Sequence, residues 1–247
     1  MSIERRAIVM GASSGMGRAV AQLLLARGWH VGLAARRGEA LERLREQYPQ
    51  HATTAVIDVT DSNAGNQLLS LVERMGGIDL YFHASGIGKQ NPNVDPEVEL
   101  ATVATNGTGF TRMVDTIFGY MAAHGGGHIA AITSIAGTKG LGAAPAYSAT
   151  KAFQNTYLQA LEQLSNMRRL GITFTDIRPG FVATALLADE HHYPMLMDTE
   201  ATARRIVKAV LAKKHVAVVD WRYRCLVALW RRVPRCVWRH LPIHTKD

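Results

Sequence analysis

Ala7-Ile8-Val9-Met10, a short apolar run typical of a buried strand, is followed directly by Gly11-Ala12-Ser13-Ser14-Gly15-Met16-Gly17. Glycines let a chain turn tightly between a strand and a helix, and they let a pyrophosphate approach the backbone closely. The spacing is G-x-x-x-G-x-G rather than the more common G-x-G-x-x-G. Because the loop stands between a predicted strand and a predicted helix, we interpret it as a dinucleotide-binding loop rather than an ordinary turn.

Beyond this loop, strand-like runs alternate with helical patterns along most of the chain. Strands are predicted at residues 7–10, 30–35, 53–57, 78–82, 128–133, 172–177 and 216–219, and helices at 18–27, 39–48, 62–75, 98–123 (one or two), 146–169 and 202–212. Apolar strands with helices between them are typical of parallel βαβ units. Right-handed crossovers then give an α/β fold, a Rossmann-type doubly wound parallel sheet of about seven strands with helices on both faces. We expect this domain over residues 1–220 and a basic amphipathic, helical C-terminal extension over 221–247.

Composition excludes several classes of protein. The chain has 247 residues, of which 47% are hydrophobic and 19% charged, as in globular rather than disordered proteins. It contains no apolar run of about 18 residues, and the first predicted strand leaves no room for a signal peptide. We therefore expect a cytoplasmic protein, with peripheral membrane association as the alternative. Cys225 and Cys236 are its only cysteines, which excludes a disulfide scaffold, and no metal site is expected.

The net charge of +8 is concentrated near the C-terminus. Residues 213–247 hold nine of the 28 Lys and Arg but only two of the 20 Asp and Glu, so the rest of the chain is nearly neutral. Because nucleic-acid binders usually carry basic charge on a domain face, we expect no nucleic-acid partner. A helix over residues 221–241 would be basic and amphipathic, and Pro234 would divide it. Three interpretations stay open: docking on the body or a dimer mate, contact with a membrane interface, or binding of an acidic partner.

The end of the second predicted strand, Ala34-Ala35-Arg36-Arg37, indicates which cofactor is bound. An acidic residue at this place would hydrogen-bond the ribose hydroxyls of NAD. A guanidinium instead matches the charge and the geometry of a 2′-phosphate. We therefore predict NADPH/NADP+ as the cofactor, with Arg36 as the better candidate and Arg37 beside it. The alternative is that both arginines are solvated residues before a helix.

Tyr147-Ser148-Ala149-Thr150-Lys151 resembles the Y-x-x-x-K motif of the short-chain dehydrogenase/reductase family, in its compact single-domain type. The resemblance covers about residues 5–219. Its motifs follow the family's order and spacing: residues 11–17, Asp58, His83-Ala84-Ser85-Gly86, Asn106, Ser134, Tyr147, Lys151 and Pro179-Gly180. It implies an NADPH-dependent oxidoreductase that reduces a ketone to a secondary alcohol by hydride transfer. The alternative is a non-catalytic, NADP-responsive binding protein that acts through its tail.

The residue types support this chemistry. Tyr147 and Lys151 are spaced i, i+4, so they share one face of a helix. A nearby ammonium favours the phenolate, so we expect Lys151 to lower the pKa of Tyr147 from its ordinary value of about 10. Tyr147 would then act as general acid/base, and Ser134 would donate a hydrogen bond to the substrate oxygen. The resemblance implies that Lys151 also binds the nicotinamide ribose and that Asn106 helps to hold a water for proton relay.

The resemblance also assigns cofactor contacts outside this catalytic set. It implies that Asp58 contacts the adenine, with Val59 beside it, although Asp58 alone would read as a helix cap. It also implies that Thr184 contacts the carboxamide. The predicted cofactor-binding residues are Gly11, Ser13, Ser14, Gly15, Met16, Gly17, Arg36, Arg37, Asp58, Val59, Ala84, Ser85, Gly86, Tyr147, Lys151, Pro179, Gly180, Val182 and Thr184. His83 departs from the family's usual Asn. The last strand lacks the Asp-Gly-Gly ending of tetrameric members, and we expect a homodimer.

The substrate side is predicted to be apolar. In the family, the pocket forms between the segments that follow Ser134, Ala84 and Gly180. In this chain those segments contribute Ile135, Leu141, Ala143, Phe181, Leu186, Leu187, Tyr193, Met195 and Leu196. Such a wall favours an apolar or extended ketone as the small-molecule carbonyl substrate, although some of these residues are expected to belong to the core.

Overall fold

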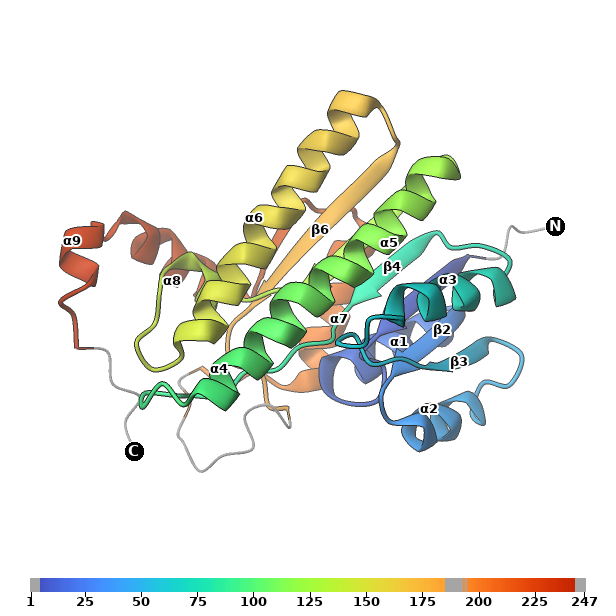
Figure 1. Cartoon of the computed structure of the whole chain (residues 1–247), viewed down its shortest axis with the longest axis horizontal. Coiled ribbons are helices and arrows are strands. Elements are labelled where there is room, and N and C mark those ends of the chain that lie inside the picture. Colours follow the sequence, from blue (N-terminus) through green and yellow to red (C-terminus); the bar gives the residue numbers. More distant parts are fainter. Residues whose placement is uncertain (1–4, 185–192, 194, 243–247) are drawn as a thin grey trace.

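A seven-stranded parallel sheet with the order β3-β2-β1-β4-β5-β6-β7 forms the centre of the computed structural model, which describes residues 5–184, 193 and 195–242 (Figure 1). The strands are β1 (Arg6–Met10), β2 (His30–Ala35), β3 (Ala52–Val56), β4 (Leu80–His83), β5 (Gly127–Ile132), β6 (Ile172–Pro179) and β7 (Val216–Val219). The strand order reverses between β1 and β4, and a crevice at the carboxyl ends of the strands is expected there. The doubly wound sheet predicted from the sequence is confirmed.

Helices cover both faces of this sheet (Figure 1). One face carries α1 (Gly15–Leu25), α2 (Gly38–Arg45) and α7 (Thr199–Leu211), and the other carries α3 (Ala64–Arg74), α5 (Phe110–Ala123) and α6 (Pro145–Arg168). In β1, Ala7 and Val9 pack into the first core, whereas Ile8 and Met10 pack into the second. Successive side chains of a strand point to opposite faces, so one apolar run supplies both cores.

The segment predicted as one or two helices over 98–123 contains three elements. These are α4 (Pro96–Val103), the π-helical turn η1 (Ala104–Gly109) and α5. Asp95 caps α4, because its carboxylate accepts a hydrogen bond from the Glu97 amide at 3.0 Å. The widened turn holds the predicted site residue Asn106, and such turns are frequent at functional sites.

The C-terminal segment folds as α8 (Trp221–Arg232) and α9 (Arg235–Trp238), drawn in red beyond the N-terminal end of α6 in Figure 1. The helical segment is interrupted at Pro234, as the sequence predicted: α8 ends before it and α9 begins after it. Tyr223 and Val227 are buried and join the core beneath α1 and α7. The described helices include none that is long and apolar enough to cross a membrane. The division of the chain at residue 220 stays a prediction.

Candidate active site

The predicted site residues gather at the carboxyl ends of the strands, where open α/β sheets bind their ligands. A cavity of about 1190 Å³ opens at this edge. The predicted residues that line it are Met16, Ala84, Gly86, Ser134, Tyr147, Lys151, Pro179, Gly180, Val182 and Thr184. The remaining predicted site residues do not line the cavity. Most of them come directly after β1, β2 and β3, at the same edge of the sheet.

The backbone conformation of the glycine loop is suited to binding the phosphates of a dinucleotide. Gly11 has a φ of +96°, and a methyl group on it would lie 2.8 Å from the carbonyl carbon of Ala84. A methyl group on Gly17 would lie 2.2 Å from the Gly11 carbonyl oxygen. Ser14, at the N-cap of α1, makes no side-chain bond to the first-turn amides. Those amides therefore remain as donors at a positive helix end, which is the chemistry that phosphate oxygens need.

Arg37 rather than Arg36 reaches the glycine loop. The Nη2 of Arg37 donates hydrogen bonds to Ser14 Oγ at 2.6 Å and to Ser13 Oγ at 3.1 Å. The Nη1 of Arg36 lies 4.0 Å from Oδ2 of Asp58. Arg37 thus holds the serines of the loop, whereas the preference for Arg36 as the residue that binds the 2′-phosphate stays a prediction.

Three predicted catalytic side chains meet at the start of α6. The Tyr147 ring packs on Gly88, where a methyl group would come within 2.5 Å of a ring carbon. The side chain of Tyr147 hydrogen-bonds that of Ser134, whose Oγ also accepts from the Ala136 amide at 3.0 Å. Lys151 Nζ lies 5.7 Å from the centroid of the Tyr147 ring. Tyrosine, serine and lysine thus form one contiguous polar group in a largely apolar cavity.

Burial raises the pKa of Tyr147, whereas the sequence argument expected a lowered value. The hydrogen bond from Ser134 acts in the opposite direction but does not outweigh burial. Burial also lowers the pKa of Lys151 to about 8, and Asp176 partly opposes this shift. The expected lowering of the Tyr147 pKa was wrong for the protein without cofactor. That expectation considered the attraction of the Lys151 ammonium and neglected the desolvation of the phenolate.

Gln154 is a site residue that the sequence reasoning missed. Lys151 Nζ donates to Gln154 Oε1 at 3.0 Å and to the Ile132 carbonyl oxygen at 3.2 Å. Gln154 Nε2 in turn donates to the Asn106 carbonyl oxygen at 2.8 Å. Gln154 therefore links two predicted catalytic residues directly. Its spacing of three residues after Lys151, on the same helix face, was the available signal.

Asn106 holds the segment after β4 with its side chain. Its Oδ1 accepts from the Ile87 amide at 2.9 Å, and its Nδ2 donates to the Ile87 carbonyl oxygen at 2.6 Å. This paired contact fixes the backbone beside Gly86, which lines the cavity. The predicted role of Asn106 in holding a relay water stays a prediction.

His83 supports the same segment from β4. Its Nε2 lies 3.1 Å from the Ser85 carbonyl oxygen, and its Nδ1 lies 2.9 Å from the Tyr81 hydroxyl. Because a carbonyl only accepts, Nε2 carries the proton and Nδ1 accepts from Tyr81. Burial and the charge of Lys151 lower the pKa of His83 to about 3, so the ring is neutral at neutral pH. His83 is therefore a structural group in this site.

The apolar lining agrees in large part with the predicted substrate wall. The cavity is lined by Ile135, Leu141, Ala143, Phe181, Tyr193 and Met195. Leu186 and Leu187 lie outside the described residues. Leu196 is not among the lining residues and is 49% exposed. The reason is the bridge between Val182 and Met197, which turns Met197 inward and its neighbour Leu196 outward.

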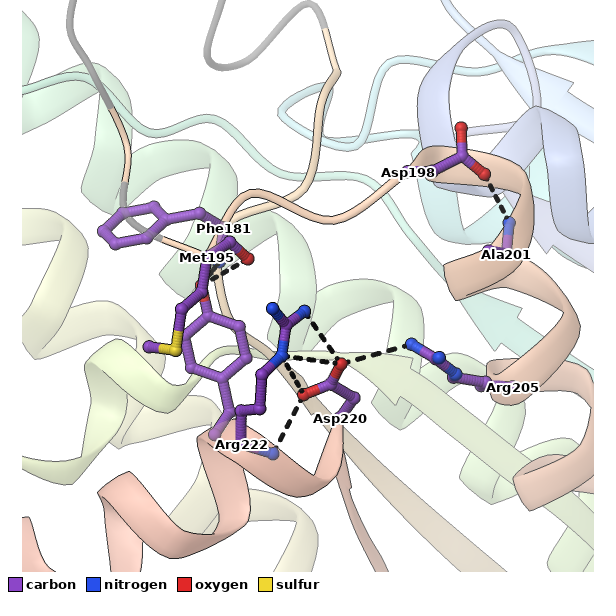
Figure 2. A network of polar contacts seen from close by, with 8 residues as sticks. Phe181, Met195, Asp198, Ala201, Arg205, Asp220 and Arg222 are labelled. Carbon is purple, nitrogen blue, oxygen red and sulfur yellow. Dashed lines mark hydrogen bonds and ion pairs between the residues drawn. The ribbon is translucent and has the colours of Figure 1, made fainter.

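Asp220 fastens the start of α8 to the body of the chain. Its carboxylate accepts from the Arg222 amide at 3.0 Å and pairs with the Arg222 guanidinium at 3.0 Å (Figure 2). Arg205 on α7 reaches the same carboxylate at 3.4 Å. The hydrogen bond from Arg222 is the main cause that holds the pKa of Asp220 below its usual range.

Tyr223 joins the tail to the loops that border the cavity. Its hydroxyl accepts from the Phe181 amide at 3.1 Å and donates to the Met195 carbonyl oxygen at 3.2 Å. Its ring packs on Gly180, where a methyl group would lie 2.1 Å from a ring carbon. The tail therefore docks on the body of the chain, which was one of the three interpretations left open by the sequence.

The family model described as short chain dehydrogenase matches residues 5–193, which include Asn106, Ser134, Tyr147 and Lys151. The chain belongs to the short chain dehydrogenase family. An uncharacterized oxidoreductase of Myxococcus xanthus strain DK1622 is 34% identical to this short chain dehydrogenase over 225 residues, which cover 88% of each chain.

Solved structures agree with this family assignment in their fold. A short chain dehydrogenase from Burkholderia cenocepacia J2315 in complex with NADP has a TM-score of 0.83 at 20% identity, covering 99% of this chain and 100% of that one. A variant of actinorhodin polyketide ketoreductase with NADPH has a TM-score of 0.76 at 25% identity, covering 87% and 95%. The α8–α9 tail of this short chain dehydrogenase lies beyond the residues that the family model matches.

Proposed function

We propose that this chain is an NADPH-dependent reductase that converts an apolar or extended ketone into a secondary alcohol. The observation that carries the proposal is that Ser134, Tyr147 and Lys151 meet in the lining of a largely apolar cavity. The family assignment supports an oxidoreductase. The two solved relatives described above, one with NADP and one with NADPH, support the choice of cofactor.

Each of the three side chains has a task in this proposal. Ser134 donates a hydrogen bond to the ketone oxygen, and Tyr147 transfers its phenolic proton to that oxygen as negative charge develops there. The raised pKa of Tyr147 suits this direction, because the phenol keeps its proton at neutral pH. Lys151 uses two of its three donors on Ile132 and Gln154, which leaves one for the nicotinamide ribose. Bound NADPH supplies the hydride.

The glycine loop, the two arginines and the remaining predicted contacts would hold the cofactor. The free amides at the start of α1 would bind the phosphates, and Arg36 and Arg37 would bind the 2′-phosphate. Asp58 and Val59 would contact the adenine, and Thr184 would contact the carboxamide.

Oxidation of NADPH and NADH by the purified chain tests the proposal directly. The assay should cover aliphatic and aromatic ketones, steroids, sugars and carrier-linked 3-oxoacyl chains. Turnover with NADPH preferred is the expected result. Tight binding of NADPH without turnover of any carbonyl would favour the alternative, a non-catalytic NADP-responsive protein.

Loss of both arginines should change the choice of cofactor. We expect Arg36→Ala/Arg37→Ala to raise the KM for NADPH about tenfold to a hundredfold, or about 1.4–2.8 kcal/mol in total. This is less than two full hydrogen bonds to charged groups contribute, because both arginines are exposed to solvent. The KM for NADH should rise much less, because NADH lacks the 2′-phosphate and is affected only through the lost bonds of Arg37 to Ser13 and Ser14. Arg43→Ala, at an exposed arginine of α2, is the matched control. An equal loss for both cofactors would contradict the assignment of the arginines to the phosphate.

Gln154→Leu should move the alkaline limit of activity to lower pH. The Gln154 amide accepts from the Lys151 ammonium and so stabilises the charged form, and burial already lowers the pKa of Lys151 to about 8. Without this acceptor the pKa falls further, by about one unit if the bond contributes about 1.4 kcal/mol. The dependence of kcat/KM on pH measures the shift, with the exposed Gln163→Leu as control. A loss that is equal at every pH would mean that Gln154 is only structural.

Four expectations about the surroundings of the protein stay predictions. They are the homodimer, the cytoplasmic location, and contact of residues 221–241 with either a membrane surface or an acidic partner.

A further inference from the structure

The cavity that holds the catalytic side chains continues to the C-terminal tail. Its volume of about 1190 Å³ exceeds the usual range for ligand pockets, which is about 300–1000 Å³. Part of the lining comes from α8, α9 and the residues between and after them. This part, which we call the tail wall, consists of Leu226, Leu229, Trp230, Val233, Trp238 and Leu241. These six side chains are uncharged and mostly apolar, so an extended apolar body can lie against them.

The tail wall is fixed to the body at both ends. At the start of α8, Tyr223 bonds Phe181 and Met195. At the end of α9, the indole nitrogen of Trp238 donates to the Gly140 carbonyl oxygen at 2.7 Å. The rings of Trp230 and Trp238 lie 5.3 Å apart and connect the two helices. The wall is therefore held in place by specific contacts.

Three leucine side chains of the tail wall are only partly buried by the rest of the protein. Leu226 is 42% exposed, Leu229 is 67% exposed and Leu241 is 45% exposed, although all three line the cavity. Burial of such apolar surface by a ligand is favourable. The wall is thus positioned to be covered by something apolar that enters the cavity.

The charged residues among the described lining are all cationic. They are Lys89, Lys151 and Arg239. Lys151 belongs to the catalytic group, whereas Lys89 and Arg239 are exposed and take no part in it. Arg239 follows α9 directly and lies in the sequence between Trp238 and Leu241, two residues of the tail wall. A carboxylate is the kind of group that a guanidinium binds well, with two parallel hydrogen bonds.

We propose that the α8–α9 tail is the substrate-selecting wall of the cavity, and that it selects an unbranched, long-chain ketone with an anionic end group held by Arg239. The proposal rests on the proposed function and adds the class of substrate to it. The ketone carbon lies at Ser134 and Tyr147, the chain lies along the tail wall, and the anion lies at Arg239.

Reduction of unbranched keto acids tests the wall. Acids with short, medium and long chains between ketone and carboxylate are compared, together with their methyl esters. Each methylene that reaches the tail wall should lower the KM about threefold to fourfold. An equal KM for short and long chains would overturn the proposal and leave the proposed function standing.

Paired variants separate the two parts of the site. Leu229→Asn should raise the KM for the long keto acid about tenfold and leave short ketones unchanged, whereas Val237→Asn, at an exposed tail residue outside the lining, should change neither. Arg239→Gln should raise the KM for the acid up to about fivefold, as for an exposed ion pair, and not for its ester. Arg224→Gln is its control, because Arg224 does not line the cavity. An equal effect of Arg239→Gln and Arg224→Gln would overturn the assignment to Arg239.

A binding measurement without turnover tests the tail wall independently of the proposed reductase activity. Trp230 and Trp238 line the cavity, so saturable binding of palmitate should change the tryptophan fluorescence of the whole chain. The change should persist in Tyr147→Phe and weaken about tenfold in Leu229→Asn. If no ketone is reduced but palmitate binds in this manner, the proposed function fails while the tail site stands. If ketones are reduced but palmitate does not bind, the tail site fails.

Discussion

Tyr147→Phe should lower the kcat for ketone reduction about a thousandfold, in the range usual for loss of a general acid. The substitution removes only the phenolic hydroxyl, and with it the proton that is transferred. The ring still packs on Gly88, so the cavity keeps its shape. Binding of NADPH, measured by its fluorescence, should change little, because the other proposed cofactor contacts remain.

Tyr157→Phe is the matched control for this experiment. Tyr157 lies on the same helix and hydrogen-bonds Asp115, away from the cavity lining. It should keep full activity. A Tyr147→Phe enzyme as active as the wild type would show that another group delivers the proton, and the proposed mechanism would be wrong.

Gly180→Ala should destabilise the fold by about 1–3 kcal/mol, the usual cost of forcing extra atoms into a packed site. A methyl group on Gly180 would lie 2.1 Å from a ring carbon of Tyr223, so the ring has to move. That movement breaks its bonds to Phe181 and Met195 and loosens α8. Urea unfolding measures the loss, and faster trypsin cleavage at the tail arginines locates it.

Two further variants make the test of Gly180 specific. Gly142→Ala should be close to neutral, because a methyl group there meets nothing within 4 Å. Gly180→Ala/Tyr223→Leu should cost less than the sum of its two single variants, since the smaller side chain leaves room for the methyl group. Strict additivity would mean that the ring does not pack on Gly180.

The sheet was predictable because most of its strands are rich in apolar residues and bounded by turns, as in Ala7-Ile8-Val9-Met10. Tyr147 and Lys151 could also be brought together, since a spacing of four residues fixes their relation on a helix. Contacts between residues that are far apart in the sequence could not be predicted from their spacing. The hydrogen bond from Gln154 to the Asn106 carbonyl oxygen, for example, joins residues 48 positions apart.

The raised pKa of Tyr147 and the place of the tail were also beyond the sequence, for different reasons. The first depends on how much water the fold removes, which composition does not report. The second depends on which surface accepts an amphipathic helix. The pattern of residues 221–241 indicated an apolar face but not that Tyr223 fits over a glycine at the end of β6.

The anchoring of the tail at Asp220, Tyr223 and Trp238 has an evolutionary consequence. The catalytic wall of the cavity and the tail wall come from parts of the chain that are far apart, and only the first carries the acid–base groups. Mutations in the last two helices can therefore reshape the cavity while the chemistry is left intact. Exchange of these helices between relatives would be a direct route to oxidoreductases of this family with a reshaped cavity.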